Sequence, residues 1–154
     1  ELDVTSLQRL VEQYKEIVFE QTGRDFPQDP REQLHLAILA VFARRARAGE
    51  PALPAPPKDV PDMAWAARYL RELRAIVGPM RDTSSAEYAL RGGMDGSYFS
   101  SRLSKLRSAL DKHLGPAAST YRIDDGGKKP HRYRLALAAE AVQLLEPGGR
   151  ASLR

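Results

Sequence analysis

The segment from Ser97 to Leu114 constrains the fold of this chain more than any other stretch. Its apolar residues recur at steps of three and four, which is one stripe of an α-helix; they are Phe99, Leu103, Leu106, Leu110 and Leu114. The opposite side has small hydroxylated and basic residues at helical spacing: Ser101, Arg102, Lys105, Ser108 and Lys112. The pattern predicts one buried face and one polar, basic face. A solvated charged face is the simplest interpretation of that polar side when the helix is taken alone.

Two further helices are predicted before this segment. Met63 to Val77 has an apolar face that includes Trp65, and Asp62 is a typical N-cap residue. A short helix is expected from Ser84 to Leu90, with Ser84 and Glu87 spaced as a capping box. Glycines at 92, 93 and 96 favour a turn into the long basic helix. The short helix, the turn and the basic helix together predict a helix-turn-helix.

The residues after Gly115-Pro116 change from helical to alternating periodicity. Tyr121-Arg122-Ile123 and the stretch 131–135 are expected to be strands, joined by the turn-rich, basic sequence D-D-G-G-K-K-P. A basic hairpin directly after a basic helix predicts a winged helix. In S-S-R-L-S-K-L-R-S-A-L and Y-R-I…Y-R-L, this half of the chain resembles the winged helix-turn-helix DNA-binding domains of bacterial response regulators. That resemblance covers roughly residues 84–137 and implies duplex DNA as the partner.

The distribution of charge agrees with a polyanionic partner for the second half. Residues 1–62 hold 8 Lys and Arg against 11 Asp and Glu, whereas residues 63–154 hold 16 against 9. The net charges are therefore −3 and +7, which favours DNA binding by the second half.

The predicted DNA-binding residues fall into two groups. Residues near the start of the basic helix are expected at base edges or nearby phosphates, and residues further along it at phosphates; they are Ser97, Tyr98, Ser101, Arg102, Lys105, Ser108 and Lys112. The hairpin would contact the minor groove or the backbone through Lys128, Lys129, His131 and Arg132. Two alternatives stay open: Tyr98 as a half-buried residue, and Arg107 as a partner of Asp111.

The first fifty residues predict a helical hairpin. One helix is expected over residues 5–21, and a second from Pro30 to about Arg47, with Leu34, Ile38, Val41 and Phe42 buried and Leu39 near their edge. The sequence T-G-R-D-F-P-Q-D-P-R-E-Q-L…A-V-F resembles a segment of pyruvate, phosphate dikinases. The similarity ends at Phe42, and the ATP-binding residues of that family lie outside it. It therefore implies a shared helical hairpin without kinase activity.

The domain organisation follows from these segments. Residues 1–49 are the helical hairpin, a candidate for dimerisation or docking, and residues 50–62 are a linker with five prolines. Residues 63–145 are the winged helix-turn-helix domain, closed by a short helix over 138–145, and residues 146–154 a disordered tail. The expected fold class is mainly α, a helical hairpin plus a winged helix-turn-helix with a small two-stranded wing.

Composition restricts the function classes. The chain has no cysteine, three scattered histidines and no apolar run that could span a membrane. We expect no catalytic residue, no cofactor, no metal and no membrane contact. The leading hypothesis is a bacterial transcriptional regulator in the cytoplasm, associated with the nucleoid and a possible homodimer through the helical hairpin. The alternative is an adaptor that binds proteins through the same winged helix and hairpin.

Overall fold

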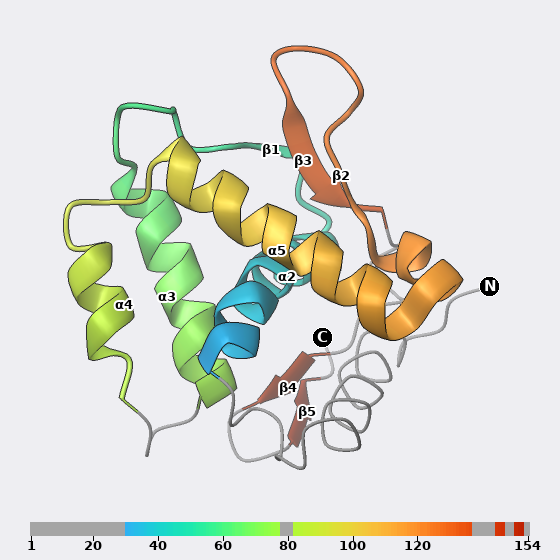
Figure 1. Ribbon diagram of the computed structural model, residues 1–154, viewed down its shortest axis with the longest axis horizontal. Coiled ribbons are helices and arrows are strands. Elements are labelled where there is room, and N and C mark those ends of the chain that lie inside the picture. The colour runs from blue at the N-terminus through green and yellow to red at the C-terminus, as the bar shows by residue number, and fades with distance from the viewer. Residues whose placement is uncertain (1–29, 78–81, 137–143, 147–149, 153–154) are drawn as a thin grey trace.

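The computed structural model describes residues 30–77, 82–136, 144–146 and 150–152. The helix predicted over residues 5–21 lies outside these ranges. Helices dominate the described residues, accompanied by a small three-stranded antiparallel sheet and a separate two-stranded hairpin (Figure 1). The helices are α2 (Pro30–Arg47), α3 (Met63–Val77), α4 (Ser84–Ala89), α5 (Gly96–Leu114) and the 3₁₀ helix η1 (Gly115–Tyr121). The strands are β1 (Leu53–Pro54), β2 (Ile123–Asp124), β3 (Arg132–Leu135), β4 (Leu144–Glu146) and β5 (Arg150–Ser152).

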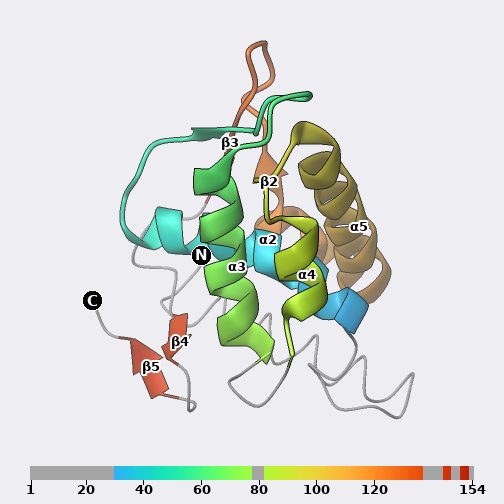
Figure 2. The ribbon, with the colours of Figure 1, turned by 90° about the vertical axis from the view of Figure 1, so that its left-hand side faces the viewer.

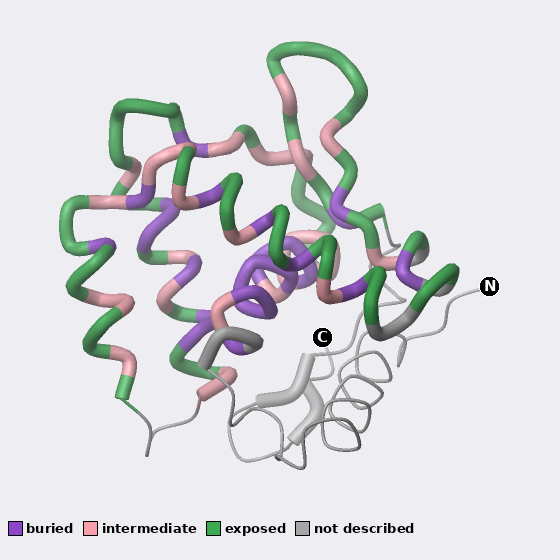
Figure 3. Tube along the Cα trace, viewed as in Figure 1, coloured by how far each residue is buried: buried purple, intermediate pink, exposed green. Residues whose placement is uncertain are grey.

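Helix α2 lies at the centre of the fold, between α3 and α5 (Figures 1 and 2). It is buried on most sides from Gln33 to Ala43, where only Leu34 and Ala40 are intermediate, and Figure 3 draws most of this stretch in purple. Its predicted bounds are confirmed, as is the burial of Ile38, Val41 and Phe42. Leu39 is fully buried and Leu34 only half-buried, because a helix enclosed by two other helices and a sheet has more than one inner face.

Aromatic rings join the three main helices. Phe42 of α2, Trp65 of α3 and Phe99 of α5 are each 1% exposed, and the ring centroids of Trp65 and Phe99 lie 5.0 Å apart. The ring of Tyr133 on β3 meets Phe99 edge-on at 5.2 Å, which attaches the sheet to the same cluster. Trp65 is therefore a core residue, as its position on the apolar face of Met63–Val77 predicts.

The three-stranded sheet has the order β1-β3-β2, and both pairings are antiparallel. Ile123 lies opposite Leu135, and both side chains are buried. The basic hairpin of the sequence prediction is thus confirmed, with its first strand two residues later than expected, because Tyr121 ends η1 instead. Leu53 and Pro54 add a third, edge strand that the sequence did not indicate.

The proline-rich segment 50–62 is extended, but it does not act as a free spacer. Pro54 pairs with Arg132, its carbonyl accepts a hydrogen bond from Trp65 Nε1 at 3.0 Å, and Pro56 is buried. The carbonyl of Pro57 accepts from the backbone N–H of Gly96 at 2.8 Å. Among the described residues, α2 therefore shares one core with α3, α5 and the sheet.

Side-chain caps explain where helices α3 and α5 begin. Asp62 accepts from the Trp65 N–H at 3.0 Å and Asp95 from the Tyr98 N–H at 2.8 Å, so both carboxylates cap their helices. The predicted Ser84–Glu87 capping box is wrong. Ser84 bonds to Asp82, and the Thr83 hydroxyl donates to the Glu87 carboxylate, because α4 starts one residue earlier than a Ser84 cap requires.

The end of the chain also corrects the prediction. Strands β4 and β5 pair in antiparallel register, with Leu145 opposite Ala151. Leu144 and Leu145 were expected to end a helix, and residues 150–152 to lie in a disordered tail. The sequence Pro147-Gly148-Gly149 between the strands is rich in turn residues, and that signal was overlooked. The rest of the predicted helix, residues 138–143, lies outside the described ranges.

Candidate nucleic-acid interface

The outer face of α5 is continuous and exposed along the helix. Its apolar stripe, Phe99, Leu103, Leu106 and Leu110, is at most 4% exposed, so the opposite side faces outward over the length of the helix. Five of the predicted residues lie there and are exposed: Ser97, Ser101, Lys105, Ser108 and Lys112. The helix thus presents hydroxyls and two ammonium groups on one face.

Tyr98 and Arg102 lie at the edge of that face, toward α3. The Tyr98 hydroxyl donates to the Tyr69 hydroxyl at 3.4 Å, and the two rings meet edge-on with centroids 5.6 Å apart. The Arg102 guanidinium stacks over the Tyr98 ring, 5.1 Å from its centroid. Tyr98 is therefore half-buried and directed toward the core, which was the alternative left open for it. Arg102 is held beside the exposed face, with its Nε buried and unpaired.

Tyr69 is the buried end of this chain of contacts. It is fully buried, and its hydroxyl donates to the Leu34 carbonyl at 2.9 Å. Burial, and then the neighbouring Tyr98, raise the pKa of Tyr69 well above its ordinary value. The phenol is therefore neutral at any physiological pH and fixes the position of Tyr98 and, through it, of Arg102.

The hairpin between β2 and β3 carries the second group of predicted residues. Lys128, Lys129 and Arg132 are exposed, and the loop projects from the body of the molecule beyond α5 (Figures 1 and 2). His131 is half-buried, and its Nδ1 lies 3.7 Å from the Asp125 carboxylate. His131 therefore has a partner within the loop, whereas the two lysines are directed to solvent.

Arg107 connects the helix to the hairpin. Its Nη2 donates to the Ile123 carbonyl at 3.3 Å, across from α5 to β2. The alternative pairing with Asp111 does not form. Arg107 thus links the side of α5 to the first strand of the hairpin.

The lysines of α5 and of the hairpin have no carboxylate partner among the described residues. Within those residues, ion pairs join Arg44 to Glu72, Arg45 to Glu50, Arg74 to Glu87 and, inside the hairpin, His131 to Asp125. Within the described residues, Lys105, Lys112, Lys128, Lys129 and Arg132 form no ion pair or hydrogen bond through their side chains. Their positive charge is therefore available to a partner.

Two residues near this face were missed by the sequence prediction. Ser104 is exposed between Ser101 and Ser108, and its helical spacing could have identified it. Lys58 is exposed in the proline-rich segment, whose backbone passes so close to the start of α5 that a Cβ on Gly96 would lie 2.9 Å from the Lys58 Cα. No local pattern in the sequence indicates that contact, because it depends on tertiary packing.

Metal sites and membrane-spanning helices were also sought in the described part of the chain. No group of three or more His, Cys, Asp or Glu residues there could hold a metal ion. None of the helices in the described ranges is sufficiently long and apolar to cross a membrane.

Comparison with known proteins finds a short similarity to plant pyruvate, phosphate dikinases. Over 42 residues, the chain is 52% identical to pyruvate, phosphate dikinase 2 of Oryza sativa subsp. japonica and to the chloroplastic pyruvate, phosphate dikinase 1 of Arabidopsis thaliana. These residues are 27% of this chain and 5% and 4% of the two relatives. The chain therefore spans only a small part of their length, and the resemblance of a segment in its N-terminal part to that family is confirmed. No family model and no solved structure matches.

Proposed function

We propose that this protein binds duplex DNA through the outer face of α5 and the β2–β3 hairpin, as a winged helix-turn-helix regulator of transcription. The observation that carries the proposal is the set of exposed cations on these two elements that lack any described carboxylate partner. Cations on a solvated helix face can pair with carboxylates at neighbouring helical positions, and Lys105 and Lys112 form no such described pair. Cations left free over two adjacent elements are typical of a surface that meets phosphates.

The docking geometry follows from the shape of α5. Its nineteen residues expose serine hydroxyls and small side chains along the centre of the outer face, so the helix can approach base edges closely. Lys105 and Lys112 would reach phosphates on the sides of the major groove, and Lys128 and Lys129 the backbone next to it. Arg102, held by the Tyr98 ring, is the residue best placed for a bidentate contact with guanine.

The helix-turn-helix component of this proposal uses α4, the turn over residues 90–95 and α5. Helix α4 has no fully buried side chain, and its exposed Tyr88 lies beside the cation of Arg91 at 3.9 Å. The turn is held by Leu90 and Met94, which are buried, and by the backbone pairing of Met94 with Asp62. The orientation of α5 is therefore fixed by the core, and α4 adds surface beside it.

The test is a fluorescence-anisotropy titration of a short random duplex at low and moderate salt. If the five free cations of α5 and the hairpin each displace a counterion, a plot of log Kd against the logarithm of the salt concentration has a slope of about 4 to 5. Affinity then falls by a few hundredfold between about 50 and 200 mM salt. An absence of binding at low salt by the folded protein would refute the proposal.

A protein-binding adaptor remains the alternative. Two exposed apolar residues outside α5 favour it: Val60, which is 62% exposed, and Met63, which is 60% exposed. An acidic protein bound at α5 would also show salt dependence, but not competition by duplex DNA. Competition between the two ligands therefore separates the hypotheses.

A further inference from the structure

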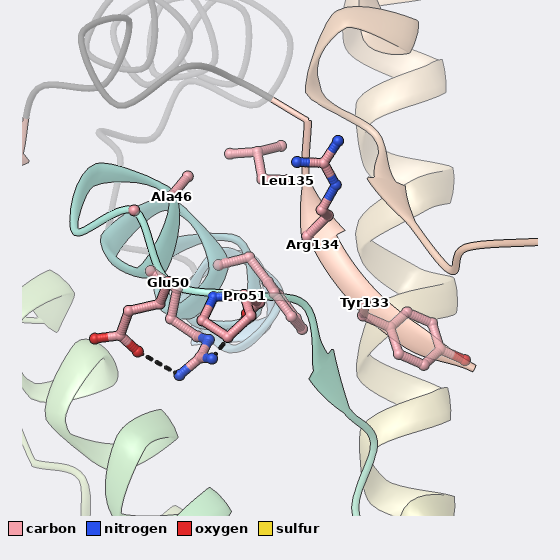
Figure 4. Close-up of a pocket in the computed structure, with 9 residues that line it drawn as sticks. Ala46, Glu50, Pro51, Tyr133, Arg134 and Leu135 are labelled. Carbon is pink, nitrogen blue, oxygen red and sulfur yellow. Dashed lines mark hydrogen bonds and ion pairs between the residues drawn. The ribbon is translucent and has the colours of Figure 1, made fainter. Parts of the chain in front are cut away.

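We propose that a hollow between α2 and β3 binds a small organic carboxylate with an apolar body about one ring in size. The hollow lies where α2 ends and the chain turns toward β1, away from the outer face of α5. Figure 4 shows Ala46, Glu50 and Pro51 on one side of it and Tyr133, Arg134 and Leu135 of β3 on the other. This site is independent of the proposed DNA contact.

The walls define the apolar part of the ligand. Phe42 and Leu135, both almost fully buried, line the hollow, and Ala46 and Pro51 contribute further apolar surface. The cavity volume is about 180 Å³. An apolar protein cavity of about 150 Å³ holds a benzene molecule, so a single ring is the expected size.

The charges define the polar part of the ligand. Arg45 and Arg134 line the hollow together with one carboxylate, Glu50. A neighbouring hollow shares Arg45 and Glu50 and adds Arg44, Arg68, Arg71 and Glu72. Five arginines against two glutamates surround the two hollows, and such an environment favours an anion.

Arg45 holds a positive charge at the hollow. Its Nη1 donates to Glu50 at 2.7 Å and its Nη2 to the Pro51 carbonyl at 2.9 Å, which fixes the guanidinium plane. Arg134, which also lines the hollow, is exposed and forms no described side-chain contact, so its guanidinium is free to pair with the carboxylate of a ligand.

The experiment uses the full chain, with benzoate as the probe and benzamide as its uncharged counterpart. We expect benzoate to bind saturably by isothermal titration calorimetry and to shift the ¹⁵N NMR signal of the Arg45 Nε–H. Benzamide should bind at least about tenfold more weakly, because it lacks the charge that arginine recognises. Inorganic phosphate should also bind more weakly, because it has no apolar body.

Three variants separate this site from other causes of binding. Arg134→Gln keeps an exposed position and should weaken benzoate binding, and Ala46→Leu should block it by filling the hollow without a change of charge. Lys105→Ala/Lys112→Ala, on the outer face of α5, should leave it unchanged. Equal binding of benzoate and benzamide, equal binding of phosphate, or an unmoved Arg45 signal would each overturn the proposal. So would unchanged binding by folded Ala46→Leu.

Discussion

Two tyrosine hydroxyls on neighbouring helices contribute different amounts to the stability of the fold. Tyr69 is fully buried and its hydroxyl donates to the Leu34 carbonyl at 2.9 Å, whereas the Tyr98 hydroxyl reaches Tyr69 only at 3.4 Å. We expect Tyr69→Phe to lower the free energy of unfolding by about 1 kcal/mol, the net value of a typical hydrogen bond. Tyr98→Phe should cost less than about half of that, since its bond is at the limit of hydrogen-bonding distance. Urea denaturation followed by the fluorescence of Trp65, the single tryptophan, measures both. An equal cost for the two variants would contradict the described hydrogen bonds.

The Glu87 carboxylate gives a second prediction at the level of single residues. The Thr83 hydroxyl, and then Arg74 at 3.2 Å, hold the pKa of Glu87 below its ordinary value. Because the pKa is lower in the folded state, the stabilisation is present above the unfolded pKa and is lost as the pH falls through the folded one. We expect Thr83→Ala to raise the Glu87 pKa toward its ordinary value, and by more than Arg74→Ala does. NMR titration of the Glu87 side chain measures this, and the reverse order would contradict the assigned causes.

The contact between the proline-rich segment and α5 can be tested with two glycines. A Cβ on Gly96 would lie 2.9 Å from the Lys58 Cα and 3.0 Å from the Pro56 carbonyl oxygen, whereas one on Gly92 would meet nothing within 4 Å. We expect Gly96→Ala to destabilise the protein by about 1–3 kcal/mol, despite the higher helix propensity of alanine. Gly92→Ala is the matched control and should be near neutral. Thermal denaturation of both variants measures the two effects. An unchanged Tm for Gly96→Ala would show that the proline-rich segment does not pack against the start of α5.

Individual elements were largely predictable because their signals are local. The bounds of α2 and α3 and the span of α5 follow from apolar periodicity, Pro30, Asp62 and the glycines that flank them. The hairpin follows from alternation around a turn-rich loop. Strand β1 could not be found in this way, because Leu53-Pro54 has no strand pattern and is extended only by its pairing with β3. The helix expected at Leu144 was wrong for a related reason: an apolar run that short fits a strand equally well.

At the level of the whole molecule, an ion pair joins the central helix to its neighbour. Arg44 of α2 makes a two-pronged contact with Glu72 of α3, whose side chain is 5% exposed. We expect Arg44→Met to destabilise the protein by about 2–3 kcal/mol, because it leaves a buried carboxylate without its cation. The double variant Arg44→Met/Glu72→Leu should recover most of that loss, since it also removes the buried charge. Chemical denaturation of the single and double variants measures the difference. A double variant as unstable as the single one would contradict this account.

The candidate interface was predictable in outline but not in detail. Helical spacing placed Ser97, Ser101, Lys105, Ser108 and Lys112 on one face, and the structure describes all of them as exposed. Spacing alone could not distinguish a side chain at the edge of that face from one at its centre. The positions of Tyr98 and Arg102 become clear only from the contact of Tyr98 with Tyr69 and of Arg102 with Tyr98. The position of Lys58 at the start of α5 depends on the path of the proline-rich segment, which no periodicity encodes.

DNA binding by the outer face of α5 can be tested by comparing two charge-reversed variants. Lys105→Glu/Lys112→Glu reverses two unpaired cations on the outer face of α5, and Arg68→Glu/Arg71→Glu reverses the same amount of charge on α3. Fluorescence anisotropy with a short duplex at low salt gives the affinity of each, and circular dichroism confirms that each is folded. Our account predicts a loss of at least about a hundredfold for the α5 variant, the value of two phosphate contacts, and a much smaller loss for the α3 variant. Equal losses for the two variants would show that net charge, and not the outer face of α5, determines binding.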